Sequence, residues 1–165
     1  MAKAATPIPT GYHTVTAHLM LDNAAQAIEW YKNGFGAKEI ARHLGPDGKI
    51  MHAVIKIGDS LVIMNDVMHG QKGPQAYGGS PASLWLYADN ADALFNQAVG
   101  AGAKVQVPLG DQFWGDRGGA VTDPAGYTWW IATRKEELAP DEIQKRAAEM
   151  FSIVPVSLPR SRKLA

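Results

Sequence analysis

The sequence predicts an α+β protein built from two tandem β-α-β-β-β modules. Short runs of alternating apolar residues are typical of strands, two amphipathic stripes at helical spacing each follow such a run, and this order of elements occurs twice. Asp22-Asn23-Ala24 returns as Asp89-Asn90-Ala91, an offset of 67 (89 minus 22). Gly36-Ala37-Lys38 returns as Gly102-Ala103-Lys104, an offset of 66 (102 minus 36). Two matches at nearly equal offsets, each at the same structural boundary, indicate an internal duplication.

The first module is expected over residues 14–66. Alternation from Thr14 to Leu21 predicts a strand, and Asn23 is a suitable N-cap for the helix that follows. The helical stripe runs to Phe35, where Gly36 supplies the positive φ that ends a helix. Three further strands, separated by glycine-containing turns, are expected at 37–44, 50–57 and 61–65.

The second module is expected over residues 83–134, after a linker at 67–82 that is rich in glycine and proline. Its strands are expected at 83–88, 104–109, 120–122 and 128–133, and its helix at 91–99. Pro140 suits the first turn of a C-terminal helix within 135–151. Residues 1–13 and 152–165 read as mobile segments, and the alternative for the second of them is an arm that packs on a partner subunit.

Composition excludes several classes of partner. Lys plus Arg and Asp plus Glu are both 16, so the net charge is zero and nothing favours nucleic acid or an anionic membrane surface. The chain has no cysteine, which removes disulfides, thiol nucleophiles and thiolate metal sites. No apolar run reaches the length of a membrane span, and the first ten residues lack the apolar core of a secretory signal. The expected location is therefore the cytoplasm.

Several motifs resemble a known family. Ala27-Ile28-Glu29-Trp30-Tyr31, followed by Phe35-Gly36-Ala37, is similar to the first-helix signature of the vicinal oxygen chelate superfamily, which includes glyoxalase I, bleomycin-resistance proteins and extradiol dioxygenases. The segments 111–117 and 123–129 resemble its PhnB-like subgroup, and the resemblance covers residues 13–151. It implies the glyoxalase/bleomycin-resistance fold, a curved mixed sheet around a cavity with the helices on its convex side. It also implies a homodimer.

The same resemblance implies where a metal would bind. Metal-dependent members place His, Gln or Glu at one cavity-facing position on each of four strands. The matching positions here are Thr16, Val62 or Met64, Ser83, and Trp130, and none of these is a usual ligand. We therefore expect no cofactor. The alternative is a divalent metal at a shifted site made of His18, His52 and Asp66.

Aromatic residues gather where the resemblance places the cavity of the second module. Flat rings with a few polar groups suit a small aromatic or hydrophobic ligand. Arg117 sits beside Asp116, which would orient its guanidinium toward an anionic or carbonyl group; the alternative is an ion pair that anchors the loop. The predicted ligand-binding residues are His18, Trp85, Tyr87, Phe113, Trp114, Arg117 and Trp130.

The predicted function is a metal-free small-molecule-binding protein of this superfamily, which sequesters an aromatic or hydrophobic ligand as a resistance protein does. The alternative is a lyase, isomerase or dioxygenase, metal-dependent or metal-free, with His18 and Asp66 as candidate catalytic acid and base. A third class is a purely structural dimeric module with no pocket. No Gly-x-Ser-x-Gly elbow or phosphate-binding loop points to another chemistry.

Overall fold

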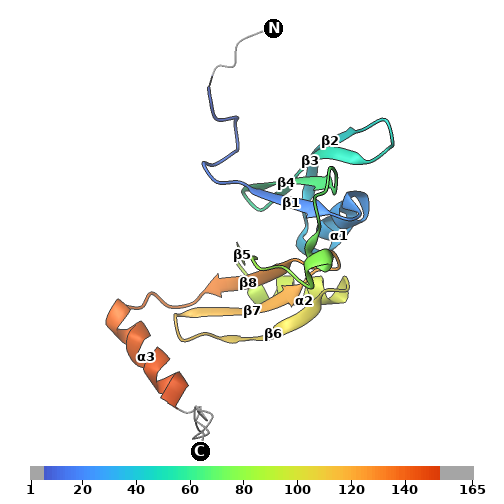
Figure 1. Ribbon diagram of the computed structural model, residues 1–165. Coiled ribbons are helices and arrows are strands. Elements are labelled where there is room, and N and C mark those ends of the chain that lie inside the picture. The colour runs from blue at the N-terminus through green and yellow to red at the C-terminus, as the bar shows by residue number, and fades with distance from the viewer. Residues whose placement is uncertain (1–5, 153–165) are drawn as a thin grey trace, which may run out of the picture.

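A computed structural model describes residues 6–152 and confirms the α+β architecture with two β-α-β-β-β modules (Figure 1). The first module contains β1 (Ala17–Leu21), α1 (Ala24–Phe35), β2 (Lys38–Leu44), β3 (Ile50–Ile57) and β4 (Ser60–Asp66). The second contains β5 (Ser83–Tyr87), α2 (Ala91–Gly100), β6 (Lys104–Asp111), β7 (Asp116–Thr122) and β8 (Thr128–Arg134). A short 3₁₀ helix, η1 (Pro74–Tyr77), lies between the modules, and α3 (Pro140–Ser152) follows the second one.

Each module forms its own four-stranded mixed sheet. The strand orders are β1-β4-β3-β2 and β5-β8-β7-β6, so the first strand of each module lies at one edge of its sheet. That edge strand runs parallel to the last strand of the module, and the remaining pairs are antiparallel. The matching topology is what an internal duplication predicts.

The expected capping residues begin and end α1. The Asn23 side chain accepts a hydrogen bond from the backbone N–H of Gln26 at 3.0 Å, and Asn90 does the same for Ala93 at the start of α2. Gly36 ends α1 at φ 65°, a left-handed conformation that costs glycine little.

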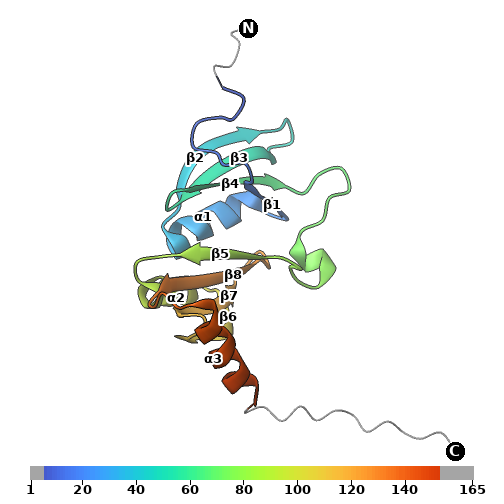
Figure 2. The same cartoon turned by 90° about the vertical axis from the view of Figure 1, so that its left-hand side faces the viewer.

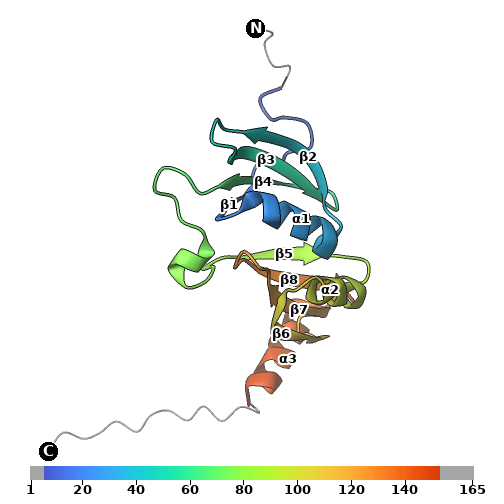
Figure 3. The same cartoon turned by 90° about the vertical axis from the view of Figure 1, so that its right-hand side faces the viewer.

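The two modules share one hydrophobic core. Figures 2 and 3 show α1 between the first sheet and the second module. Apolar side chains of β1, β5 and β8 join residues of α1 and α2 in this core. The core includes Leu19, Leu21, Ile28, Tyr31, Phe35, Trp129 and Ile131, all at most 6% exposed.

A buried hydrogen-bond cluster joins the modules. The Tyr31 hydroxyl of α1 donates to Asp123 Oδ2 at 2.6 Å, and Trp129 Nε1 donates to the same oxygen at 2.8 Å. Asp123 Oδ1 accepts from the backbone N–H of Tyr127, whose hydroxyl bonds the backbone N–H and carbonyl of Met20 in β1. Burial raises the pKa of the Asp123 carboxyl and that of the Tyr31 hydroxyl. The Asp123 turn thus fixes the second module to the first.

The starts of two strands differ from the sequence prediction by three residues or more. The first strand begins at Ala17 rather than Thr14, and β7 runs over Asp116–Thr122 rather than 120–122. Gly118 and Gly119 suggested a loop, but both lie within a strand that is paired on its two sides. A Cβ on Gly119 would come within 2.7 Å of the Val107 carbonyl oxygen, so this glycine allows β6 and β7 to approach closely.

The C-terminal helix projects from the second module (Figure 1). None of its residues is buried. Arg146 links the helix to the preceding segment by a contact with Glu136 at 2.5 Å, and it also donates to Glu142 within the helix at 3.0 Å. The predicted tail at 152–165 lies, apart from its first residue, outside the described part of the chain. Within residues 6–152, no helix is both long and apolar enough to cross a membrane.

Candidate functional site

Three tryptophans form an aromatic wall on the second sheet. Trp85 of β5 and Trp130 of β8 are register partners in parallel strands, so their side chains leave the same face of the sheet. Their rings stack at 4.9 Å between centroids with an interplanar angle of 4°. Trp114, in the turn between β6 and β7, lies 6.1 Å from each ring at 64° and 66°. This aromatic wall (Trp85, Trp114 and Trp130) faces away from the core that holds Trp129.

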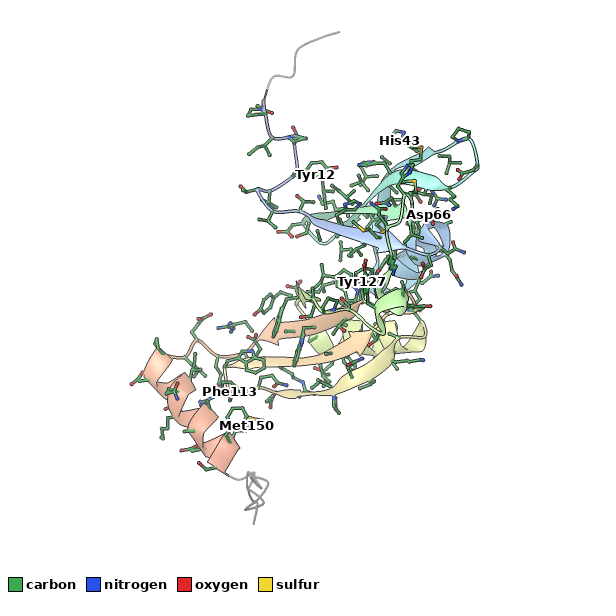
Figure 4. All side chains as sticks on the ribbon, viewed as in Figure 1. Tyr12, His43, Asp66, Phe113, Tyr127 and Met150 are labelled. Carbon is green, nitrogen blue, oxygen red and sulfur yellow. The ribbon has the colours of Figure 1, made fainter. Side chains whose placement is uncertain are left out.

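Two more predicted residues extend the aromatic wall. Tyr87 lies 6.2 Å from Trp85 between ring centroids, and Phe113 lies 4.9 Å from Trp114. Phe113 also lies 6.5 Å from Phe151, which places it on the α3 side of the second module, as Figure 4 shows. Trp85 is 44% exposed and Tyr87 is 57% exposed, so large ring surfaces remain open to solvent. An exposed group of aromatic rings is typical of a binding surface.

A buried carboxylate holds the aromatic wall in place. Asp116 is 1% exposed and accepts hydrogen bonds from the Tyr87 hydroxyl and from Trp114 Nε1, both at 2.9 Å. Arg134 Nε donates to the second oxygen at 2.5 Å. Sequence reasoning missed Arg134, although it lies four residues after Trp130 on the same strand face. Asp116 therefore orients two rings and brings a guanidinium to the edge of the aromatic wall.

The structure places Arg117 on the opposite face of β7. Its Nε and Nη2 atoms donate to the two oxygens of Asp92 at 2.7 Å each, and Nη1 contacts Asp111 at 3.3 Å. The predicted pairing with Asp116 at the ligand site is wrong, because neighbouring strand residues point to opposite faces. The contacts of Arg117 match the alternative, in which it forms a structural ion pair. Its guanidinium holds the pKa of the Asp92 carboxyl below its usual range.

Replacing Arg117 tests this placement. Arg117→Gln is expected to lower the free energy of unfolding only slightly, because solvent screens the bidentate ion pair that is lost at the start of α2. Urea denaturation followed by tryptophan fluorescence measures the change. Asp92→Asn is expected to give a similar loss, and ligand binding at the aromatic wall should stay unchanged in both variants. A strong loss of ligand binding in Arg117→Gln alone would contradict the placement.

His18, His52 and Asp66 are not brought together. His18 lies on the exposed face of β1, where its Nε2 atom forms a short contact with Asn65 Oδ1 of β4. Asp66 points to the other face and accepts the backbone N–H groups of Ala24 and Ile50, at 2.7 Å each. Asp66 therefore stabilises the start of α1 and the start of β3. His52 instead lies beside His43, with 5.9 Å between ring centroids, and Figure 4 shows the labelled His43 and Asp66 apart.

The donor set does not fit the metal site that the resemblance implies. Val62 and Met64 are buried in the core, and Trp130 is stacked in the aromatic wall. The Val62 and Trp130 side chains supply no lone pair to a metal, and the Met64 thioether suits soft ions rather than the divalent cations that His and carboxylates hold. The Thr16 hydroxyl donates to the backbone carbonyl of His13 in the segment before β1. The face of β4 opposite the core carries Ile63 and Asn65 rather than Val62 and Met64, which corrects the face assigned to this strand. Among residues 6–152, no three His, Asp or Glu residues are grouped to hold an ion.

A cleft in the described part of the chain lies between the two modules and not over the aromatic wall. It has a volume of about 830 Å³ and is lined by the start of β1, the β3–β4 turn and β5. Of the predicted ligand-binding residues, only Trp85 and Tyr87 line it. Trp85 is thus shared between the aromatic wall and this inter-module cleft.

Comparison with known proteins identifies the family. Residues 12–131 match the family model of the Glyoxalase/Bleomycin resistance protein/Dioxygenase superfamily. An uncharacterized Mycobacterium bovis protein is 42% identical over 135 residues, which cover 79% of this chain and 89% of the relative.

Solved structures share the fold. The crystal structure of an Arabidopsis thaliana gene product has a TM-score of 0.61 and 27% identity, and covers 73% of this chain and 98% of that one. A Bacillus cereus PhnB protein has a TM-score of 0.57 at 17% identity, covers 73% of this chain and 99% of that one, and shows likeness of fold alone. The chain belongs to the glyoxalase/bleomycin resistance protein/dioxygenase superfamily.

Proposed function

We propose that the protein binds a planar aromatic or hydrophobic small molecule on the aromatic wall and sequesters it without a metal. The observation that carries this proposal is the parallel stack of Trp85 and Trp130, flanked by Trp114 and partly open to solvent. A flat ligand gains apolar burial and ring stacking on such a surface. The rings need little reorganisation, because Asp116 already holds Trp114 and Tyr87 by hydrogen bonds.

Polar groups at the edge of the aromatic wall would orient the ligand. Arg134 uses Nε to bind Asp116, while its Nη1 atom lies 3.8 Å from Glu137, a side chain that is 89% exposed. The guanidinium therefore has N–H groups available for a carbonyl or anionic substituent. In this proposal Arg134 takes the role that the sequence suggested for Arg117.

An enzymatic role has less support from the geometry. Both oxygens of Asp66 accept backbone N–H groups, and His18 contacts Asn65 on the other face of the sheet. A general acid–base pair needs both groups within reach of the same substrate atoms. These two side chains therefore do not form the predicted catalytic pair.

The homodimer that the family resemblance implies stays a prediction. Sedimentation equilibrium would measure the mass of the protein in solution and so test it.

Tryptophan fluorescence tests the proposed binding. We expect planar polycyclic compounds to quench the emission, and their saturated ring analogues, which have similar size but no flat π face, to bind much more weakly. Trp130→Ala is expected to weaken binding of the planar compounds about tenfold to hundredfold, because one stacking surface is lost. Trp30→Phe serves as the matched control, since Trp30 lies on α1 and donates to the Ala101 carbonyl. No quenching by any planar compound, or equal binding of the saturated analogues, would contradict the proposal.

A further inference from the structure

The inter-module cleft has an apolar floor built by both modules. Phe35 at the end of α1 and Trp129 of β8 contribute to it, together with Leu84 and Leu86 of β5 and Val62 of β4. Its volume of about 830 Å³ lies within the range of small-molecule sites, which are commonly about 300–1,000 Å³. The cleft follows the edge strands β1 and β5, which Figure 1 shows on facing sides of the two modules.

The rim of the inter-module cleft is acidic. Asp59, in the turn between β3 and β4, lines it from the first module, and Asp89, after β5, lines it from the second. No Lys or Arg is among the described residues that line the cleft, although His13 is. Ser60 donates to Asp59 at 2.7 Å, and this hydrogen bond holds the pKa of the Asp59 carboxyl below its usual range, with smaller contributions from His13 and Lys56. Two acidic residues on opposite modules therefore line the same cleft.

Aromatic side chains line the cleft near one of these carboxylates. Trp85 stacks on Trp130, and both Trp85 and Tyr87 also line the cleft, four and two residues before Asp89 respectively. Ring faces attract organic cations, and carboxylates attract them further. An apolar floor, aromatic rings and an acidic rim together favour a ligand with an apolar body and a positive charge.

We propose that the inter-module cleft binds a hydrophobic organic amine, with its apolar part on the Phe35–Trp129 floor and its ammonium group at Asp59 and Asp89. This site goes beyond the proposed function, because Trp114, Trp130 and Phe113 do not line the cleft. The chemical class follows from charge complementarity: an anion would be repelled by two carboxylates, and a neutral compound would leave them unused.

Three probes that share one apolar group test the charge preference. 4-Phenylbutylamine, 4-phenylbutanol and 4-phenylbutyrate are titrated into the full chain by isothermal calorimetry at pH 8, above the range in which imidazole usually titrates. The amine is expected to bind about tenfold more tightly than the alcohol, and the acid more weakly than both. Asp59→Asn with Asp89→Asn should reduce the preference for the amine over the alcohol to about twofold or less.

Two control variants make the result specific. Glu149→Gln, on the exposed surface of α3, removes the same kind of charge outside the cleft and should leave the amine preference unchanged. Trp114→Leu should weaken the binding of planar ligands at the aromatic wall but not that of the amine. The proposals for the two sites are therefore tested separately. Equal affinity for amine and alcohol, no binding of the amine, or a preference that survives loss of both carboxylates overturns the proposal. The proposal is also overturned if binding of the amine falls as the protein self-associates, because a second copy of the chain would then fill the cleft.

Discussion

Asp123→Ala is expected to lower the free energy of unfolding by roughly 3 kcal/mol, a larger loss than any surface substitution would cause. The carboxylate is 3% exposed and accepts three hydrogen bonds, from the Tyr31 hydroxyl, Trp129 Nε1 and the Tyr127 backbone N–H. Alanine would leave these donors without partners inside the core that joins the modules. Urea denaturation followed by circular dichroism measures the change, and Asp47→Ala in an exposed turn is the control.

Tyr31→Phe isolates the contact between the modules. It removes only the hydroxyl at 2.6 Å from Asp123 and is expected to cost about 1–2 kcal/mol. In the double variant the two losses should not add, because both remove the same hydrogen bond. Full additivity, or a loss below about 1 kcal/mol for Asp123→Ala, would show that this cluster does not hold the modules together.

The pH dependence of stability gives the same cluster a second signature. Burial raises the pKa of Asp123 in the folded protein above its usual value of 3.8, so the folded state holds this proton more tightly than the unfolded state. Protonation of Asp123 therefore contributes to the free energy of unfolding. This contribution is fully present below pH 3.8 and is lost as the pH rises through the pKa of Asp123 in the folded protein. Stability of Asp123→Asn is expected to change less over this window than that of the parent protein.

Asp116→Ala is expected to weaken binding of planar ligands at least tenfold and to lower the free energy of unfolding by about 2 kcal/mol. The buried carboxylate is the common acceptor for Tyr87, Trp114 and Arg134. Without it, Trp114 and Tyr87 lose the hydrogen bonds that hold their rings. Fluorescence titration with the best planar ligand measures the affinity, and near-ultraviolet circular dichroism reports the order of the tryptophans.

Arg134→Gln distinguishes the effect of ring positioning from the effect of direct contact between Arg134 and the ligand. It leaves Asp116 bonded to Tyr87 and Trp114, so the aromatic wall should keep its geometry. We expect a smaller loss of affinity than in Asp116→Ala, and it should be largest for ligands that carry an anionic substituent. Unchanged affinity in Asp116→Ala would contradict a positioning role for this carboxylate.

Much of the fold could be predicted because the duplication repeats both patterns and residues. Asn23 and Asn90 lie at the same helix start in the two modules. The Asn23 side chain caps α1 as expected, and the Asn90 side chain caps α2 in the same way. The family resemblance was sufficient to predict that Trp85 and Trp130 lie at one site, and the two-residue period of a strand agrees with it. The stacked pair at the centre of the aromatic wall follows from that parity and from the register of two parallel strands.

The predictions that failed concern which face of a strand a side chain leaves. That face depends on strand pairing, which the sequence does not show. In β4 a register shift of one residue places Ile63 and Asn65, instead of Val62 and Met64, on the face opposite the core. In β7 the glycines Gly118 and Gly119 favour a loop, so the sequence pattern does not show that Asp116 and Arg117 occupy successive strand positions. Once they lie in a strand they must point apart. Arg134 was overlooked because charged residues after the last apolar position suggested the end of the strand.

A crystal structure with the planar compound that quenches most strongly tests the central claim most directly. The account predicts the compound stacked on the aromatic wall, with its ring centroid about 4.5–7 Å from Trp85, Trp114 or Trp130. It also predicts a polar substituent within hydrogen-bond distance of Arg134. A compound bound away from these rings, or one ligated to a metal held at His18, would contradict binding at the aromatic wall.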